Sequence, residues 1–385
     1  MRRSPTSLGT RGGRLVVLLA AAILVGGGLF LAWRLQPSGP LQVEVVQDEL
    51  EHPWDLAFTD DGRLVVTERI GRVRVFASAE AGAELVHTAT VPDVRAELES
   101  GLMGIAIHGD AVIVCATRGA DPADHASWRV DLLRSTLAAD GSLAPFEALP
   151  IGPAQGAPRH QGCAVEVGPD ERLWLTIGDA NLPVGENRAQ DPAILNGKVV
   201  RLELDGSVPA DAAFPSGAVS IGHRNPQGLA FRSDGLILEV EHGTDVNDEI
   251  NVIRSGRNYG YPCVTGASEP GPIPDACDPG AELTAPAWAS GSPTLATSGA
   301  TFLEGGSWGP WAGDLVVTTL KEEDLRRFSV APDGRLTAEE TLLDGEYGRL
   351  RAAVIGPDGA LYLSTANGSD DRVLRVTLAE PPSGE

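Results

Sequence analysis

The stretch GPDERLWLTIGD (168–179) carries the pattern that decides the fold, a tight turn followed by a short run of alternating apolar residues. Five other stretches share this pattern: DDGRLVVTE (60–68), HGDAVIVCA (108–116), RSDGLILEVEHG (232–243), AGDLVVTTL (312–320) and GPDGALYLSTA (356–366). A second strand-like run precedes three of the six copies, and such pairs are typical of β-hairpins. Six copies in about 340 residues, roughly 57 residues each, match four-stranded blades with variable loops. We therefore predict an all-β, six-bladed β-propeller, with a β-sandwich or two β-domains as the alternative.

The composition excludes several other classes of protein. Of the 385 residues, 42% are apolar, which is too many for an intrinsically disordered chain. The 46 glycines and 28 prolines show no Gly-X-Y period, so a collagen-like protein is excluded. The formal net charge of −23 argues against a nucleic-acid partner, because such binding requires a basic surface.

The N-terminal segment differs from the rest of the chain. Residues 1–40 contain five arginines and no acidic residue, and the 19 residues from Leu15 to Trp33 carry no charge. Such a run can cross about 30 Å of hydrocarbon as a helix, and the arginines before it predict a cytoplasmic N-terminus. A cleaved signal peptide followed by secretion is the alternative. The expected organisation is a basic tail over 1–14, a transmembrane anchor or uncleaved signal over 15–35, a linker over 36–47 and an extracytoplasmic propeller over 48–380.

The four cysteines suit an oxidising compartment. Cys263 and Cys277 flank the loop PCVTGASEPGPIPDAC, and we predict a disulfide between them that closes this loop. Cys115 and Cys163 each lie in an apolar, strand-like run, and the sequence leaves open whether they pair or stay as buried thiols. There is no C-x-x-C pair of the kind that suggests zinc.

Three segments concentrate residues that can carry chemistry. IGHRNPQGLAF (221–231) places Arg224, whose planar fork of donors suits a carboxylate, just before a strand. EVEHGTDVNDEINVIRSGRNYGYP (239–262) gathers acidic residues around glycine, as calcium sites do, without the spacing of an EF-hand. A loop arginine that binds carbonyls and a solvated acidic turn are the simpler interpretations.

The third segment, APRHQGCAVEVGPDERLWLTIGDA (157–180), contains a candidate acid–base pair. His160 precedes one strand and Asp179 follows its partner, so both are expected near the same end of one hairpin. A histidine oriented by a carboxylate is a plausible general base near neutral pH. A structural histidine is the alternative.

Taken together, the body of the chain, about residues 48 to 378, resembles the soluble quinoprotein glucose dehydrogenases and aldose sugar dehydrogenases, also called glucose/sorbosone dehydrogenases. The motifs that carry the resemblance are HPWDLAF, GLMGIAIH, RHQGCAVEVGPDERLWLTIGD, AQDPAILNGKVVRLELDG, GHRNPQGLAF, EHGTDVNDEINVIRSGRNYGYP and YGRLRAAVIGPDGALYL. The resemblance implies a six-bladed propeller that oxidises a sugar hemiacetal with pyrroloquinoline quinone (PQQ) and calcium.

The resemblance also implies roles for individual residues. His160 matches the general base and Asp179 the acid that orients it. Arg224 and Asn225 match residues beside the quinone carbonyls. The residues that match contacts to the cofactor's carboxylates, the last with weaker alignment, are Lys321, Arg349, Arg351 and Thr294. Gly243 and Thr244 match the pair whose backbone carbonyls hold the cofactor calcium, and Glu249 and Tyr259 match ligands of a second, structural calcium.

Two positions depart from the family pattern. Glu99 stands near substrate and base where the glucose dehydrogenases have a neutral amide, and its charge is expected either to repel the quinone or to raise the pKa of His160. Thr244 replaces a proline common in the family, a change that a backbone ligand tolerates. Glucose is therefore not favoured over other aldoses as the substrate.

The sequence thus favours a PQQ- and calcium-dependent sugar or alcohol dehydrogenase. Two alternatives are a calcium-bearing propeller that binds a glycan or protein without catalysis, which Glu99 favours, and a lactonase-like hydrolase. The expected partners are a small sugar substrate, an electron acceptor that the sequence does not identify, the membrane through the N-terminal helix alone, and a second copy in a homodimer.

Overall fold

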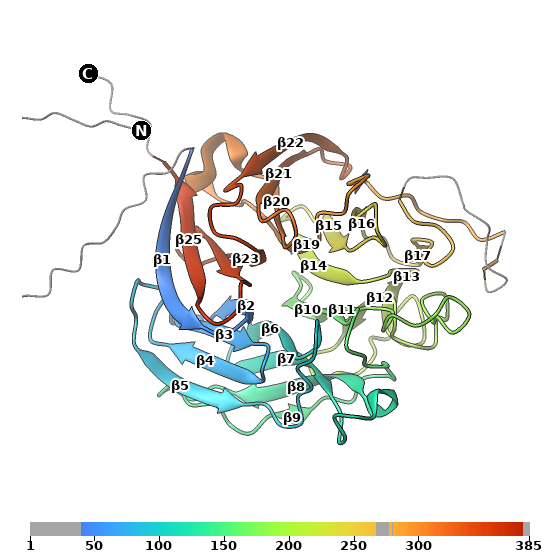
Figure 1. Cartoon of the computed structure of the whole chain (residues 1–385), viewed down its shortest axis with the longest axis horizontal. Helices are drawn as coiled ribbons and strands as arrows, with labels where there is room; N and C mark the ends of the chain where they lie inside the picture. The colour runs from blue at the N-terminus through green and yellow to red at the C-terminus, as the bar shows by residue number, and fades with distance from the viewer. Residues whose placement is uncertain (1–39, 267–276, 279, 380–385) are drawn as a thin grey trace, which may run out of the picture. The chain divides into compact units, whose positions relative to one another are not determined.

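The computed structural model describes residues 40–266, 277–278 and 280–379. Their strands form six antiparallel sheets arranged as the blades of a propeller (Figure 1), as the six repeats predict. Blade 1 contains β2 (Pro53–Phe58), β3 (Leu64–Glu68), β4 (Arg72–Phe76) and β5 (Leu85–Thr90). Blade 2 contains β6 (Leu102–His108), β7 (Ala111–Arg118), β8 (Arg129–Thr136) and β9 (Glu147–Ala148). Blade 3 contains β10 (Gly162–Val167), β11 (Leu173–Ile177), β12 (Lys198–Leu202), β13 (Ala218–Ile221) and the added parallel strand β17 (Arg257–Asn258).

The remaining blades complete the ring. Blade 4 contains β14 (Pro226–Phe231), β15 (Ile237–Glu241), β16 (Glu249–Val252) and β18 (Trp288–Ala289). Blade 5 contains β19 (Thr297–Phe302), β20 (Leu315–Thr319), β21 (Leu325–Val330) and β22 (Leu336–Leu342). Blade 6 contains β23 (Leu350–Ile355), β24 (Leu361–Thr365), β25 (Asp371–Leu378) and β1 (Leu41–Leu50). The helical segments in the described residues are the short 3-10 turns η1 (His125–Ser127) and η2 (Gly306–Trp311).

Each repeat recognised in the sequence occupies the same place in its blade. In all six blades its turn joins the innermost strand to the second strand, and the alternating run forms the second strand. The second strands are buried on both faces because each sheet packs between two others, as β3 and β11 illustrate. Each copy of the turn-and-strand pattern therefore marks the inner hairpin of one blade, and the number of copies gives the number of blades.

The ring is closed by strands from the two ends of the described chain. Strand β1 pairs antiparallel with β25 and forms the outer strand of blade 6 (Figure 1). This pairing includes residues that the sequence assigned to a linker over 36–47, so the propeller begins earlier in the chain than expected. The strand was missed because its apolar alternation has no preceding Asp-Gly turn.

The inner strands β2, β6, β10, β14, β19 and β23 form a closed ring around a central channel, and residues from all six line a cavity in it. They approach one another so closely that some positions have room for glycine alone. A Cβ added at Gly104 would lie 2.3 Å from the Cys163 carbonyl oxygen, and one added at Gly299 would lie 2.5 Å from the Arg351 carbonyl oxygen. Glycine at these positions lets adjacent blades meet at the channel wall.

Both pairs of cysteines form disulfides. The predicted bridge between Cys263 and Cys277 is confirmed, with their Cα atoms 5.9 Å apart. Cys115 on β7 and Cys163, left open by the sequence, also pair, with their Cα atoms 5.7 Å apart. This second bridge joins blades 2 and 3 next to the channel, whereas the first links Cys263, which follows β17 of blade 3, to Cys277, which precedes β18 of blade 4.

The expected membrane segment, 15–35, lies outside the described residues. Among the residues that are described, no helix is both long enough and apolar enough to span a membrane. The membrane anchor and the homodimer therefore stay predictions.

Candidate active site

The propeller brings the predicted site residues to one end of its channel. Every blade starts at the channel and runs outward with the same antiparallel order, so the six inner strands run in the same direction. The residues just before an inner strand therefore share one end of the channel with those just after a second strand. Residues of the first kind are Glu99, His160, Asn225, Thr294 and Arg349, and residues of the second kind are Arg69, Asp179, His242 and Lys321.

His160 and Asp179 form the pair that the sequence predicts. The Nδ1 atom of His160 lies 2.8 Å from Oδ1 of Asp179, and both side chains are buried. Asp179 is held in turn by the backbone N–H of Asn181 and the side-chain amide of Asn187, each at 2.8 Å. Because Nδ1 faces the carboxylate, the second ring nitrogen of His160 is the one available to a substrate.

Tyr261 supports the same carboxylate and was not singled out from the sequence. Its hydroxyl interacts with both Asp179 and Arg224, and burial, reinforced by the Asp179 charge, raises the pKa of Tyr261. The hydroxyl therefore stays protonated and can donate to the carboxylate. Only the NYGYP motif, quoted for the family resemblance, contained a hint of this role.

Glu99 lies beside His160 but is not an isolated charge. Its Oε1 accepts from Nη1 of Arg159 at 2.8 Å, and its Oε2 accepts the backbone N–H of His160 at 3.1 Å. Burial acts to raise the pKa of Glu99, but that N–H, the imidazoles of His160 and His242, and Arg159 outweigh it and lower the pKa. Glu99 is thus a charged group that fixes the backbone of the candidate base.

Arg224 and Asn225 link the hairpin of blade 3 to blade 4. The backbone carbonyl of Arg224 accepts from the N–H of Asp179 at 2.8 Å, and Oδ1 of Asn225 accepts from the N–H of Gly162 at 3.1 Å. The Arg224 guanidinium donates to the Gly243 carbonyl at 2.5 Å, and its buried Nε finds no partner within the described residues. The side chain is therefore only partly satisfied by the protein.

Three further basic side chains approach the same end of the channel. Arg349 donates to the Leu320 carbonyl at 3.0 Å, and Lys321 Nζ lies 3.3 Å from Oγ1 of Thr294. Arg351 is buried with its guanidinium 3.6 Å from the centre of the Trp54 ring. Sequence reasoning named all of these residues except Trp54.

Arg69 belongs to this group and was missed. Burial, followed by the charges of Arg349 and Arg69, lowers the pKa of Arg351 to about 9, although Glu99 and Asp55 oppose the shift. The Nε of Arg69 is also buried without a partner in the described part of the chain. Arg69 follows the second strand of blade 1, the position that Asp179 and Lys321 hold in their blades, and this repeat position was the available signal.

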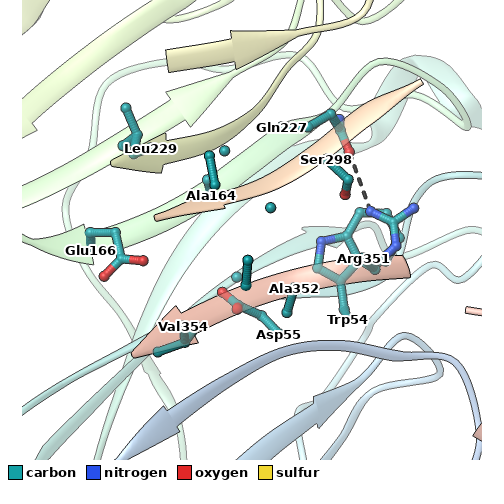
Figure 2. A pocket seen from close by; sticks show the side chains of 15 residues that line it. Trp54, Asp55, Ala164, Glu166, Gln227, Leu229, Ser298, Arg351, Ala352 and Val354 are labelled. Atoms are coloured by element: carbon teal, nitrogen blue, oxygen red, sulfur yellow. Dashed lines mark hydrogen bonds between the residues drawn. The ribbon is translucent and has the colours of Figure 1, made fainter. Parts of the chain in front are cut away.

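A cavity lined by all six inner strands continues from Arg351 into the channel (Figure 2). Gln227 accepts from Arg351 at 3.3 Å and donates to Asn225 at 2.9 Å, so a hydrogen-bonded chain joins the channel to the site. Deeper in the cavity, burial raises the pKa of Asp55 to about 7. Burial and the Asp55 charge also raise the pKa of Glu166 well above its usual range.

The predicted calcium residues lie together around a second cavity. Gly243, Glu249 and Tyr259 line it, together with Arg224 and Tyr261, whereas Thr244 is exposed on the adjoining turn. Burial and the Glu241 charge raise the pKa of Glu249 to about 8. The Tyr259 hydroxyl donates to the Val252 carbonyl, so this side chain is already occupied.

Known proteins share the sequence of this chain over the six blades. The family model described as "Glucose / Sorbosone dehydrogenase" matches residues 50–375. Aldose sugar dehydrogenase YliI of Escherichia coli is 32% identical over 88% of this chain and 93% of its own length. Quinoprotein glucose dehydrogenase B of Acinetobacter calcoaceticus is 31% identical over 65% of this chain and 60% of its own length.

Solved structures agree as well. A PQQ-bound aldose sugar dehydrogenase from Streptomyces coelicolor superposes with a TM-score of 0.72 and 26% identity, over 89% of this chain and all of the other. The matched region covers the six blades and the site at the end of their channel. The chain belongs to the glucose/sorbosone dehydrogenase family of oxidoreductases.

Proposed function

We propose that the protein oxidises an aldose or a related sugar or alcohol with PQQ and calcium, and that His160 is the general base. The single observation that carries the proposal is the concentration of unneutralised cations beside the His160–Asp179 pair. Within the described residues, Arg69, Arg224, Arg349, Arg351 and Lys321 form no ion pair with a carboxylate. Buried or crowded cations without counter-ions are costly, and an anionic ligand removes that cost.

The chemistry of these residues fits PQQ, which carries several carboxylates. Guanidinium groups bind carboxylates through paired hydrogen bonds, and the unpartnered Nε atoms of Arg69 and Arg224 offer donors that the protein leaves unused. We expect Lys321, Thr294, Arg349 and Arg351 to bind the carboxylates and Arg224 and Asn225 to bind near the quinone oxygens. When bound, PQQ and its calcium would supply the oxidising group for a two-electron oxidation of the sugar.

Gly243 suits a backbone calcium ligand. A Cβ at this position would lie 2.0 Å from the Val246 carbonyl oxygen and 2.3 Å from that of Asn247, so the turn is too tight for any side chain. The Gly243 carbonyl is bound by Arg224, and calcium would take over this oxygen together with that of Thr244. A second calcium would use the Glu249 carboxylate and the backbone carbonyl of Tyr259, because the Tyr259 hydroxyl is engaged elsewhere.

The protein residues would divide the reaction among them. His160 would take the proton from the anomeric hydroxyl through Nε2 as the hydride leaves the same carbon. Asp179, fixed by Asn181 and Asn187, would keep the ring in the productive tautomer and stabilise the imidazolium. Arg224 would stabilise negative charge that develops beside the site.

Reconstitution tests this function. The apoprotein would be mixed with PQQ and Ca²⁺, and a panel of aldoses would be added with an artificial electron acceptor. We expect the bound quinone to be reduced and the acceptor to turn over with at least one aldose. Tight PQQ binding without reduction by any sugar or alcohol would instead support a binding propeller.

We also propose that the body lies outside the cytoplasmic membrane, held there by the segment over 15–35. Two disulfides in the described propeller support an oxidising compartment. Fractionation of cells tests this location, since the anchored protein should stay with the membranes. A soluble mature protein that begins near residue 36–41 would show instead that the segment is a cleaved signal.

A further inference from the structure

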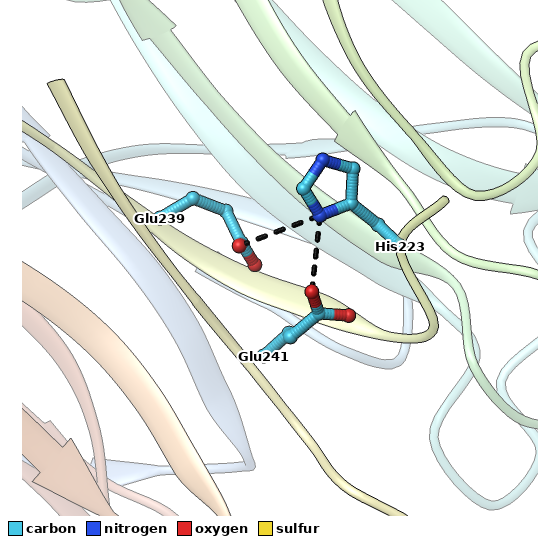
Figure 3. Close-up of side chains that lie close together, drawn as sticks. All are labelled: His223, Glu239 and Glu241. Atoms are coloured by element: carbon cyan, nitrogen blue, oxygen red, sulfur yellow. Dashed lines mark hydrogen bonds and ion pairs between the residues drawn. The ribbon is translucent and has the colours of Figure 1, made fainter. Parts of the chain in front are cut away.

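A buried group of carboxylates in blade 4 plays no part in the proposed oxidation. Glu239 and Glu241 lie two residues apart on β15, so their side chains share one face, and His223 approaches both from the turn before β14 (Figure 3). The register of β15 and β16 places Asn251 opposite Glu239, and Glu249 opposite Glu241. His223, Glu239 and Asn251 are fully buried and Glu241 is 3% exposed.

The charges in this group are not balanced by the protein. Like charges directly opposite each other across two strands are destabilising, and Glu241 and Glu249 occupy such a pair of positions. Oε1 of Glu239 and Oδ1 of Asn251 are buried and make no hydrogen bond to any described residue. Either a proton or a cation has to offset the negative charge here.

The distances fit a cation as well as they fit the hydrogen bonds that join these side chains. His223 Nδ1 lies 3.6 Å from Oε2 of Glu239 and 3.0 Å from Oε1 of Glu241. The Asn251 amide nitrogen lies 3.1 Å and 2.9 Å from the same two oxygens. Ligand atoms around a tetrahedral ion with bonds of about 2.0 Å lie about 3.3 Å apart. The four distances above lie on both sides of this value. Rotation of the Asn251 carboxamide would present its oxygen at the fourth corner.

The surroundings also match a metal centre. Nε2 of His223 lies 2.8 Å from Oγ of Ser220, which fixes the ring with Nδ1 toward the carboxylates. Oε2 of Glu241 accepts the backbone N–H of Arg224 at 2.6 Å and so orients that carboxylate. Glu241 also lines the cavity beside Arg224, which gives an entry path.

We propose that His223, Glu239, Glu241 and Asn251 bind one divalent transition-metal ion, for which Zn²⁺ is the best fit. An imidazole nitrogen with carboxylate and amide oxygens suits Zn²⁺ or a related ion, whereas Ca²⁺ takes oxygen ligands alone. The ion is structural, because the protein supplies every ligand. Its four ligands differ from those proposed for the two calcium ions, although the Asn251 amide nitrogen lies 3.4 Å from Oε2 of Glu249, and it needs neither PQQ nor sugar.

Zinc titration tests the proposal. Untagged protein is first stripped of metal with a chelator, and Zn²⁺ is then titrated into a mixture of this protein and a chromophoric zinc ligand that competes for the ion. The native protein should bind one Zn²⁺ that excess Ca²⁺ does not displace. Glu239→Gln should lower Zn²⁺ affinity at least about tenfold. Glu166→Gln, a matched change at a buried carboxylate in the channel, should leave it within about threefold. Failure of the native protein to bind Zn²⁺, displacement by Ca²⁺, or unchanged affinity in Glu239→Gln would overturn the proposal.

A second measurement keeps the test decisive if Glu239→Gln does not fold. X-ray absorption of the zinc-loaded native protein should show light-atom ligands that include a single imidazole. No imidazole, or two or more, would place the ion elsewhere and overturn the assignment. A higher Tm for Glu239→Gln in chelator, with no zinc response in either protein, would show that a shared proton balances the carboxylates instead.

Discussion

The two halves of the candidate active site differ in how far the protein satisfies its own charges. Around His160, the Asp179 carboxylate accepts hydrogen bonds from the His160 ring, the Asn181 backbone and the Asn187 side chain. Glu99 forms an ion pair with Arg159. At the other half, Arg69, Arg224, Arg349 and Arg351 interact with carbonyl oxygens, an amide and a ring rather than with carboxylates. The first half has its charges paired within the protein, whereas the second leaves its cations without a carboxylate partner among the described residues. The comparison separates the residues proposed to perform the chemistry from those proposed to hold the cofactor.

Replacement of His160 tests the half of the site whose charges are paired within the protein, and we expect it to have the largest effect on turnover. In His160→Ala, proton abstraction is lost while the basic residues remain, so turnover should fall by about 10²–10⁴-fold. PQQ affinity should change much less, because the residues proposed to bind the cofactor are untouched. The measurements are turnover, PQQ affinity and Tm of the same preparation. Turnover above about a tenth of that of the native protein would remove His160 from the role of base.

Asp55 lines the channel cavity next to Arg351 and tests whether this cavity excludes water. Burial raises its pKa in the folded protein from the ordinary value to about 7, so the folded state holds a proton that the unfolded chain releases near pH 4. This group therefore stabilises the fold at low pH and loses that contribution as pH rises from about 4 to about 7. We expect the loss to be on the order of 2–4 kcal/mol.

Asp55→Asn should not show this loss, because the amide does not titrate. Urea unfolding of the native protein and of Asp55→Asn at several pH values between 5 and 8 measures the loss. The quantity compared is the difference in unfolding free energy between the two proteins at each pH. Relative to the native protein, the variant should become more stable as the pH rises. A difference in unfolding free energy that stays constant with pH would contradict a desolvated Asp55.

Arg351 tests the unsatisfied half. Arg351→Gln should weaken PQQ binding by about 10–100-fold, the range for loss of a charged hydrogen bond of about 1.5–3 kcal/mol. It should leave thermal stability of the ligand-free protein unchanged or higher, because a buried cation is removed. Arg372→Gln, an exposed arginine on β25, is the matched control. Equal PQQ affinity in both variants would show that the cation group is not the cofactor site.

Glu99 lies between the two halves and should have the smallest effect. Glu99→Gln removes a negative charge that interacts with His160, His242 and Arg351. We expect PQQ affinity to rise by a few-fold, because a negative charge beside the proposed site of the anionic cofactor is removed. Cofactor titration measures this change. Weaker PQQ binding in the variant would mean that Glu99 helps to hold the cofactor.

The fold was predictable because each blade repeats one local pattern. The Asp-Gly turn and the alternating second strand recur six times, and hairpins of this kind are set by neighbouring residues. The closing strand β1 was not predictable in this way, because its pairing with β25 joins segments more than 300 residues apart. The pairing of Cys115 with Cys163 likewise depends on how blades 2 and 3 meet, which no local pattern contains.

The candidate site divides in a similar way. His160 and Asp179 could be paired from the sequence because they flank one hairpin. Arg69 and Tyr261 were missed. Their only signals were the repeat position of Arg69 after β3 and the NYGYP motif around Tyr261, and their partners come from blades that meet at the channel. Glu99 could be placed near the base from the sequence, but its ion pair with Arg159, on the same segment as His160, could not. The candidate residues could be chosen by type from the sequence, whereas their interaction partners depend on how the blades are arranged.

In the proposed oxidation, His160 takes the proton of the anomeric hydroxyl while a hydride leaves the carbon that bears this hydroxyl. The most direct measurement is a rapid-mixing experiment in which protein loaded with PQQ and Ca²⁺ meets an aldose carrying hydrogen or deuterium at C1, with quinone absorbance followed in a single turnover. The account predicts that the quinone is reduced, more slowly with deuterium, and about 10²–10⁴-fold more slowly in His160→Ala. Reduction at the same rate in His160→Ala, or a bound quinone that no aldose reduces, would contradict it.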